Sequence, residues 1–209
     1  MKILSYPRSG SNFLYYSLSV IGIYLGKTHG QNKEFWLDKE SDKKLVFMIR
    51  NYKESIPRQI DGYKFDDRFK SQISNYRTDN DDHHFDYISI LDYYDKYTGP
   101  KIIVYYEDFI NDTKNELIRV VDFISDGIDN TILVEEFIKN IEFHKKSSSD
   151  RYNSMMGVIG CKSINDNKVD LLFHSNKITK VLKNKIDRYL YKNYKELFSK
   201  YLARYLEKI

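Results

Sequence analysis

The chain has 209 residues, of which 41% are hydrophobic and 31% charged, and its formal net charge is +4. This composition excludes an intrinsically disordered chain, and its mild basic bias suits an anionic ligand but is too weak for a nucleic-acid-binding arm. The single cysteine, Cys161, excludes a disulfide framework and a cysteine-based zinc cluster. No apolar run approaches the roughly 20 residues of a membrane span, so we expect a cytoplasmic protein with one domain, residues 1–209, and with no membrane or nucleic-acid partner.

Strand-like and helix-like segments alternate along the chain. The apolar segments that predict strands are residues 2–6, 23–27, 44–49 and 101–106. Apolar residues at helical spacing predict helices over residues 12–21, 88–97, 113–125, 131–141 and 176–207. This order predicts an α/β fold with a mainly parallel central sheet flanked by helices, in which ligands bind beyond the carboxyl ends of the strands.

Other segments have weaker patterns. After the strand at residues 44–49 we expect a helix with Ser55 as its N-cap and Pro57 in its first turn. Residues 61–86 are rich in polar side chains, which predicts loops and an exposed helix. Residues 147–167 are polar and contain glycine, which predicts a loop. The basic side chains of the last helix are expected to form a solvated face.

The turn between the first strand and the first helix is the clearest indication of function. Its sequence is Tyr6-Pro7-Arg8-Ser9-Gly10-Ser11-Asn12-Phe13. A helix N-terminus offers backbone N–H groups and the positive end of the helix dipole, a glycine lets the backbone approach a phosphate, and an arginine adds a charged fork of donors. The segment therefore predicts an anion site. The alternative is an ordinary turn with Ser11 as the N-cap, and the Gly-Lys pair of the ATP-binding loop is missing.

Three further segments resemble the motifs of one enzyme family, in the family's order. They are Gly26-Lys27-Thr28-His29, Val46-Phe47-Met48-Ile49-Arg50-Asn51 and Val104-Tyr105-Tyr106-Glu107-Asp108-Phe109. Together with the turn at residues 6–13, they resemble sulfotransferases that use 3′-phosphoadenosine 5′-phosphosulfate (PAPS), over residues 2–125. The resemblance implies a P-loop-NTPase-like sulfotransferase fold, PAPS as co-substrate, the desulfated product PAP, no metal, and transfer of a sulfuryl group to a hydroxyl or amine.

The resemblance implies roles around the transferred group, where positioning and electrostatics carry an in-line displacement. Arg8 is expected to bridge the 5′-phosphate and the leaving oxygen, and the backbone donors of Ser9–Phe13 to hold the same phosphate. His29 is expected to be the general base, because imidazole titrates near neutrality. Lys27 is expected to face the developing sulfuryl charge. The alternative is that His29 and Lys27 are ordinary surface residues, as we expect for His83, His84, His144 and His174.

The resemblance also implies a 3′-phosphate site. Arg50 is expected to bind the 3′-phosphate. The alternative is that Arg50, at the end of a strand, pairs with a surface carboxylate. Arg58 replaces the serine of the family pattern, so either Arg58 or Ser55 is expected to complete this side. Tyr106 is expected to lie near the adenine or to pack in the core. Glu107 and Asp108 are expected to be structural, as caps or orienting groups.

The loop expected to complete the nucleotide site departs from the family pattern. Gly157 belongs to a segment that faintly resembles the family's Arg-Lys-Gly loop, but Met155-Met156 replaces the Arg-Lys pair, and Arg151 or Lys162 is expected to compensate. This departure supports an alternative function, a non-catalytic anion- or nucleotide-binding protein of the same fold. A small nucleotide kinase is the other alternative.

The acceptor is expected to be a small molecule or a glycan. Variable loops would bind it, at residues 30–42, 61–86 and 145–165. Aromatic residues in these loops suggest a pocket, with core packing as the alternative for most of them: Phe35, Trp36, Tyr63, Phe65 and Phe69.

Overall fold

The computed structural model describes residues 1–30, 43–60, 64–74, 77–78, 81–84, 86–126, 129–158 and 179–206, with the backbone alone for 77–78, 81–84 and 152–158. The strands are β1 (Lys2–Ser5), β2 (Gly26–Thr28), β3 (Leu45–Ile49), β4 (Arg77–Thr78), β5 (Asp81–His84) and β6 (Lys101–Tyr105). The helices are α1 (Ser11–Val20), α3 (Tyr52–Ile60), α4 (Asp67–Ile73), α5 (Tyr87–Lys96), α6 (Tyr106–Asn111), α7 (Thr113–Ser125), α8 (Thr131–Lys139), α9 (Ile141–Val158), α10 (Lys180–Asn193), α11 (Lys195–Leu197), the π-helix η2 (Phe198–Leu202) and the 3₁₀-helix η3 (Ala203–Tyr205).

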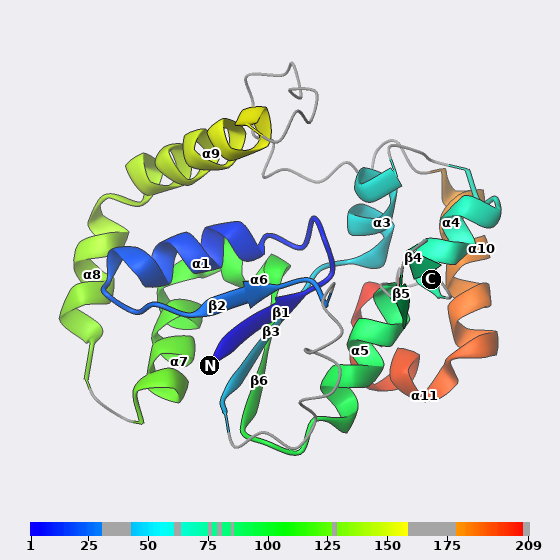
Figure 1. Cartoon of the computed structure of the whole chain (residues 1–209), viewed down its shortest axis with the longest axis horizontal. Coiled ribbons are helices and arrows are strands. Elements are labelled where there is room, and N and C mark those ends of the chain that lie inside the picture. The colour runs from blue at the N-terminus through cyan, green and yellow to red at the C-terminus, as the bar shows by residue number, and fades with distance from the viewer. Residues whose placement is uncertain are drawn as a thin grey trace.

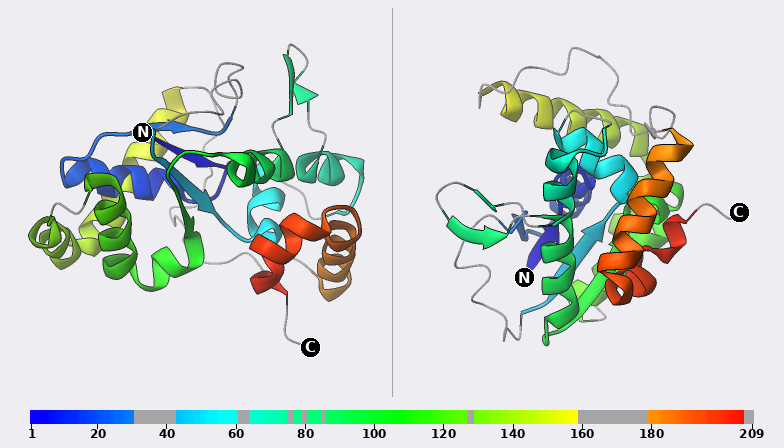
Figure 2. Two further views of the ribbon diagram at one scale, coloured as in Figure 1. Left: turned by 90° about the horizontal axis from the view of Figure 1, so that it is seen from below. Right: turned by 90° about the vertical axis from the view of Figure 1, so that its right-hand side faces the viewer.

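The central sheet has four parallel strands in the order β2-β1-β3-β6 (Figure 1). Ile3 of β1 pairs with Lys27 on one side and with Val46 on the other, and Val46 pairs with Ile102 of β6. Because all of these strands run in the same direction, the segments that follow β1, β2 and β3 begin at one edge of the sheet. Strands β4 and β5 form a separate antiparallel ribbon (Figure 2).

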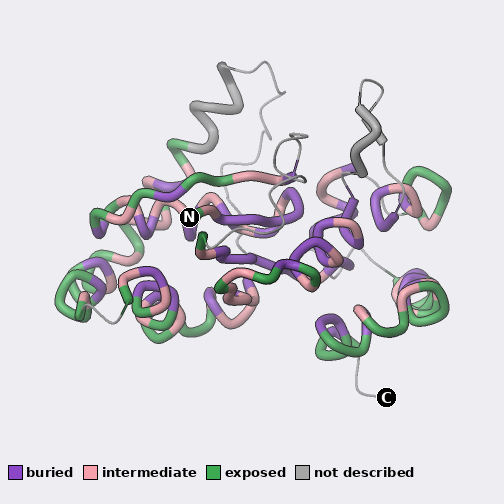
Figure 3. Tube along the Cα trace, turned by 60° about the horizontal axis from the view of Figure 1, so that its bottom comes forward, coloured by how far each residue is buried: buried purple, intermediate pink, exposed green. Residues whose placement is uncertain are grey.

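Alternate strand residues feed two apolar cores, one on each face of the sheet. Ile3, Val46 and Val104 pack with residues of α1, α6, α7 and α8. Leu4, Phe47 and their neighbours pack on the other face with residues of α3, α4, α5, α10 and η2. Figure 2 shows these two groups of helices on either side of the strands, and Figure 3 shows buried segments gathered along the sheet. The predicted α/β fold with a parallel, helix-flanked sheet is confirmed.

The second strand begins later than predicted, at Gly26 rather than at residue 23. The reason is the end of α1: Gly22 has a positive φ of 86°, and the Ile23 N–H donates to the Leu18 carbonyl at 2.8 Å. This is the hydrogen bond of a left-handed helix cap, so residue 23 belongs to the turn that ends α1.

Helix α3 begins at Tyr52, so the prediction of Ser55 as its N-cap is wrong. Asn51 is the cap: its side-chain oxygen accepts from the Lys53 N–H at 3.0 Å, and its carbonyl accepts from the Glu54 N–H at 2.8 Å. Pro57 therefore lies inside the helix, where it removes an N–H donor. The Asn51 cap therefore decides where α3 begins, although proline by itself prefers the first turn of a helix.

The loop predicted for residues 147–167 is wrong over residues 147–158, which form the second half of α9. The polar sequence of this segment lacks the apolar spacing that indicates a helix, and its buried side includes Ser148. His144 on α9 is also not a solvated loop residue. Its ring stacks on Phe137 with centroids 4.4 Å apart, and its Nδ1 lies 3.3 Å from the Tyr16 hydroxyl.

The C-terminal part is mostly helical over its described residues, as predicted for residues 176–207, but it consists of several helical elements. Helix α10 ends at Asn193 and is followed by α11, η2 and η3, which pack back toward β6. The basic residues of α10 lie largely on its exposed side, as expected, and include Lys180, Lys185, Arg188 and Lys192. In the segment predicted to be exposed, α4 instead buries Phe69 and Ile73. Among the described residues, no helix is long and apolar enough to cross a membrane.

Candidate functional site

The turn after β1 has an unusual backbone that brings it against the core. Arg8 has φ 64° and Gly10 has φ 82°, so two of its residues are left-handed. A Cβ atom on Gly10 would lie 2.2 Å from Cδ2 of the buried Tyr106 ring. Only glycine meets both conditions, because it tolerates positive φ and has no side chain to strike the ring. Strain of this kind gathers at functional sites, where the surrounding structure imposes it.

Helix α1 begins directly after this turn, with Gly10 rather than Ser11 as its N-cap. The first N–H groups of a helix have no intrahelical acceptor, so those of Ser11 and Asn12 are donors available to a ligand. The Phe13 N–H differs, since it donates to the Gly10 carbonyl at 3.0 Å. The Phe13 ring packs edge-on against Phe109 with centroids 5.5 Å apart. Phe13 thus anchors the helix in the core, and the structure does not present it to a ligand.

Ser9 contributes a hydroxyl that is buried within the turn. The residue is 1% exposed, and its Oγ has no hydrogen-bond partner among the described residues. A buried polar group without a partner costs about 1–3 kcal/mol. Such a group indicates a ligand atom that completes the site.

Arg50 comes to the same place from the end of β3. The residue is 2% exposed, and its Cζ lies 4.2 Å over the Tyr106 ring. Its Nη1 donates to the Arg8 carbonyl at 3.5 Å, whereas Nε and Nη2 have no hydrogen-bond partner among the described residues. A buried guanidinium with unused donors is a strong anion ligand. Ser9 and Arg50 therefore form one cluster of unsatisfied donors between the turns after β1 and β3.

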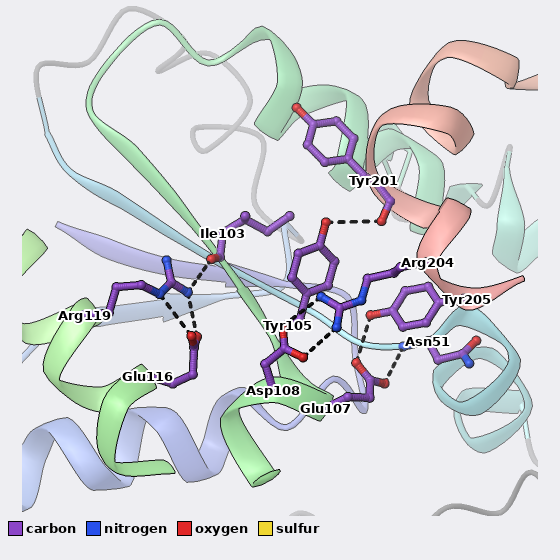
Figure 4. Close-up of polar contacts among 10 residues, drawn as sticks. All are labelled: Asn51, Ile103, Tyr105, Glu107, Asp108, Glu116, Arg119, Tyr201, Arg204 and Tyr205. Carbon is purple, nitrogen blue, oxygen red and sulfur yellow. Dashed lines mark hydrogen bonds and ion pairs between the residues drawn. The ribbon is translucent and has the colours of Figure 1, made fainter. Parts of the chain in front are cut away.

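Neighbouring segments fix the position of Arg50. Its carbonyl accepts from the Tyr87 hydroxyl at 2.6 Å. The N–H of the next residue, Asn51, donates to Glu107 Oε1 at 3.0 Å, and the Tyr205 hydroxyl donates to Glu107 Oε2 at 2.9 Å (Figure 4). The expectation that Glu107 is an orienting group agrees with these contacts: it caps the start of α3 from a different helix.

Asp108 links the same region to the C-terminal segment. Its carboxylate accepts two hydrogen bonds from Arg204, at 2.6 and 2.8 Å, and the Arg204 guanidinium lies 4.1 Å over the Tyr105 ring (Figure 4). The bidentate geometry fixes both partners more firmly than a single contact does. η3 is therefore fastened to β6 and α6 directly beside the Arg50 segment.

Tyr106 lies beneath the cluster rather than at its surface. The residue is 1% exposed and separates Gly10 from Arg50. Burial raises the pKa of its hydroxyl, and the positive charges of Arg50 and Arg58 act in the opposite direction. Arg58 lies on α3, and its positive charge acts on the Tyr106 hydroxyl in the same direction as that of Arg50. Ser55 is turned to the helix backbone, where its Oγ donates to the Asn51 carbonyl at 3.3 Å.

His29 follows β2 and is attached to the end of β1. Its Nδ1 lies 2.9 Å from the Ser5 carbonyl oxygen and 3.1 Å from Ser5 Oγ. A carbonyl oxygen accepts only, so Nδ1 carries the proton and the neutral ring keeps its lone pair on Nε2. Burial lowers the pKa of His29, the Ser5 contact raises it, and the charges of Lys27 and Arg8 lower it further. The net effect on the pKa favours the neutral form of the ring.

Lys27 connects the strand that carries His29 to the first turn of α1. Its Nζ donates to Asn12 Oδ1. The residue reaches the surface, but neighbouring atoms desolvate its ammonium group and lower its pKa. Lys27 and Asn12 thus lie together at the mouth of the turn, with the lysine charge close enough to act on His29.

Some of the sequence-based expectations fall on other parts of the chain. Gly157 lies in the last turn of α9, and nothing beyond its helical backbone is described. The expectations for Lys162, His174, Phe35, Trp36 and Tyr63 lie outside the described residues, as do the side chains of His83 and His84. Arg151 is an exposed residue of α9. Phe65 and Phe69 pack on each other in the core, with ring centroids 5.8 Å apart.

Sequence reasoning missed one charged residue of the site, Glu54. Its side chain is 1% exposed and its Oε2 lies 3.9 Å from Arg50 Nη2. The spacing of four residues was visible in the sequence, but only the start of α3 at Tyr52 places both residues on one side of the chain. In the described part of the chain, no group of three or more histidine, cysteine, aspartate or glutamate side chains could hold a metal ion.

Comparisons with known proteins agree with this architecture. No family model and no curated protein matches the sequence. The structure is similar to the crystal structure of mouse sulfotransferase SULT7A1 complexed with PAP, with a TM-score of 0.60 and 15% identity, over 99% of this chain and 88% of that chain. At this identity the likeness concerns the fold. The chain therefore has a sulfotransferase fold, built on a four-stranded parallel sheet flanked by helices.

Proposed function

We propose that this chain, as one domain over residues 1–209, is a sulfotransferase that moves a sulfuryl group from PAPS to an acceptor hydroxyl or amine. One observation carries the proposal. Ser9 Oγ and the Nε and Nη2 atoms of Arg50 are buried donors without hydrogen-bond partners among the described residues, and a hydrogen bond from Arg50 Nη1 to the Arg8 carbonyl joins the two turns that carry them. A fold neighbour contains PAP, and this ligand has phosphates at both ends of its ribose.

The turn after β1 would hold the 5′-phosphosulfate end of the nucleotide. Arg8 supplies a charge that bridges the 5′-phosphate and the leaving oxygen, while Ser9, Gly10, Ser11 and Asn12 supply hydroxyl, amide and backbone donors. Phe13 would serve this site by packing on Phe109, since its N–H already donates to the Gly10 carbonyl. The dipole of α1 adds positive potential at the point where the leaving group gains charge.

Arg50 and Arg58 would bind the 3′-phosphate. Arg50 lies over the Tyr106 ring, and the charge of Arg58 also acts on the Tyr106 hydroxyl, so the two would share one anion. Tyr106 would then fix the spacing between the two ends of the nucleotide, because its ring contacts Gly10 on one side and Arg50 on the other. Gly157, near the end of α9, would also contribute to the nucleotide site, as its resemblance to the family's loop implies.

His29 would accept the proton that the acceptor loses. Its Nδ1–H donates to the Ser5 carbonyl, which fixes the ring and leaves Nε2 as the base. The acceptor oxygen or nitrogen forms a bond to sulfur as the bond from sulfur to the 5′-phosphate oxygen breaks, and the proton moves to Nε2. Lys27, whose charge also lowers the pKa of His29, would stabilise the equatorial sulfuryl oxygens.

The test separates binding from transfer. We expect calorimetry to show PAP binding, with Arg50→Gln weakening it at least about tenfold because a buried charge-assisted contact is lost. His29→Gln is expected to keep PAP binding within about twofold and to reduce transfer from labelled PAPS by about 10²–10⁴-fold, the usual contribution of a positioned base. Small hydroxyl and amine compounds and glycans serve as acceptors.

Two results would contradict the proposal in different ways. Absence of PAP binding would refute the nucleotide site altogether. PAP binding without transfer to any acceptor of the panel would instead support the alternative, a non-catalytic nucleotide-binding protein of the same fold.

A further inference from the structure

A buried carboxylate lies beside Arg50, and the proposed transfer chemistry gives it no role. Glu54 follows Arg50 by four residues, and the side chains of Arg50 and Glu54 are 3% and 1% exposed. Their nearest charged atoms, Nη2 and Oε2, are 3.9 Å apart. That separation lies within ion-pair distance but beyond that of a hydrogen bond.

The positive charge of Arg50 is therefore balanced, whereas two of its hydrogen-bond donors are not satisfied. Glu54 balances the buried positive charge, which would otherwise be costly. It does so without engaging the Nε and Nη2 donors, which have no hydrogen-bond partner among the described residues. A phosphate oxygen would satisfy both charge and donors, so it is the better partner for the guanidinium once it arrives.

Other charges near the pair do not remove this competition. Arg50, Arg58, Glu107 and Glu54 are the charged groups that affect the pKa of the Tyr106 hydroxyl. Of the two carboxylates, Glu107 already accepts hydrogen bonds from Asn51 and Tyr205 on both oxygens. Glu54 is the one that lies at ion-pair distance from Arg50, and both side chains are buried.

We propose that Glu54 is an internal counter-anion of Arg50 that competes with the 3′-phosphate of the nucleotide and so sets the affinity for that phosphate. The inference rests on the proposed function. It makes Glu54 a positioning residue that acts through Arg50. Its negative charge stabilises the ligand-free protein, and the same charge repels the incoming phosphate. Replacing the carboxylate with a neutral group of the same shape should therefore change stability and affinity in opposite directions.

The experiment uses Glu54→Gln and calorimetry with two ligands, PAP and adenosine 5′-monophosphate, which lacks the 3′-phosphate. We expect Glu54→Gln to bind PAP at least about fivefold more tightly, to bind the monophosphate within about twofold of the unchanged chain, and to melt at a lower temperature without ligand. Glu136→Gln, a change of the same charge at an exposed position of α8, is the control and should alter neither quantity.

A Glu54 that merely supports the fold would give a different result: lower stability together with weaker or unchanged PAP binding, which would overturn the inference. If Glu54→Gln does not fold, the double variant Arg50→Gln/Glu54→Gln decides the question. It should be more stable than Glu54→Gln, because the uncompensated charge is gone, and a less stable double variant would overturn the inference.

The outcomes also separate this inference from the function on which it rests. If the unchanged chain binds no PAP, the proposed function fails and the inference fails with it. If the unchanged chain binds PAP and Glu54→Gln binds it no more tightly, the inference alone is refuted.

Discussion

Gly10 offers a direct measurement of how closely the turn after β1 fits the core. In Gly10→Ala, an L-residue would adopt φ 82°, which costs about 1–2 kcal/mol. Its Cβ would also lie 2.2 and 2.3 Å from two atoms of the Tyr106 ring, so the ring must move by over 1 Å to restore ordinary contact. That ring is buried beneath Arg50, and overpacking of this kind costs about 1–3 kcal/mol. We expect a total of about 2–5 kcal/mol.

Gly22 is a matched control for this change. It has φ 86°, and a Cβ there would have no atom within 4 Å, so Gly22→Ala should cost only the conformational part, about 1–2 kcal/mol. Urea unfolding of both variants measures the difference. In addition, Gly10→Ala combined with Tyr106→Ala should be less destabilised than the sum of the single changes, because the obstructing ring is removed. Equal losses for Gly10→Ala and Gly22→Ala would refute the close fit of the turn.

Three further predictions concern groups around the site. The lowered pKa of His29 means that the transfer rate should rise with pH with a midpoint below the ordinary value of 6.5, and a midpoint above 6.5 would contradict the burial of the ring. Because the folded state also binds this proton less readily than the unfolded state, His29 contributes stability that is present above pH 6.5 and is lost as pH falls through the lowered pKa. Tyr205→Phe removes the hydroxyl that donates to Glu107, so we expect the free energy of unfolding, measured with urea, to fall by about 1–3 kcal/mol. An unchanged free energy of unfolding would show that this hydrogen bond does not stabilise the protein. Lys53→Met leaves the partly buried Asp187 without its ion-pair partner and should lower the free energy of unfolding by about 3 kcal/mol. Lys96→Met, at an exposed ion pair, should lower it by less than about 1 kcal/mol. Similar losses for both variants would contradict the difference in burial.

The sequence predicted the parts of this fold whose causes are local. The strand at residues 101–106 and the helix at residues 113–125 were visible because apolar runs and helical spacing extend over whole elements. The turn at residues 6–13 was recognisable because proline, glycine and a following apolar helix form a compact pattern.

Other features depend on distant contacts and could not be predicted from local pattern. The start of α3 is fixed partly by Glu107, which takes the N–H of Asn51 from another helix. Helix α9 contains serines that favour caps and loops, and it nevertheless packs on α1. The buried position of Tyr106 beneath Gly10 required the packing of two turns that are far apart in the chain.

The attachment of η3 has a consequence for the order in which the site can form during synthesis. Lys53 donates to the Tyr205 carbonyl at 2.9 Å across 152 positions, and Tyr205 reaches Glu107 across 98 positions. A nascent chain therefore contains Arg50 and the start of α3 long before it contains the segment that fixes them, and long-range contacts of this kind form slowly. Until residue 205 has left the ribosome, the start of α3 lacks its last fastening, so competence to hold an anion should be acquired late in biogenesis.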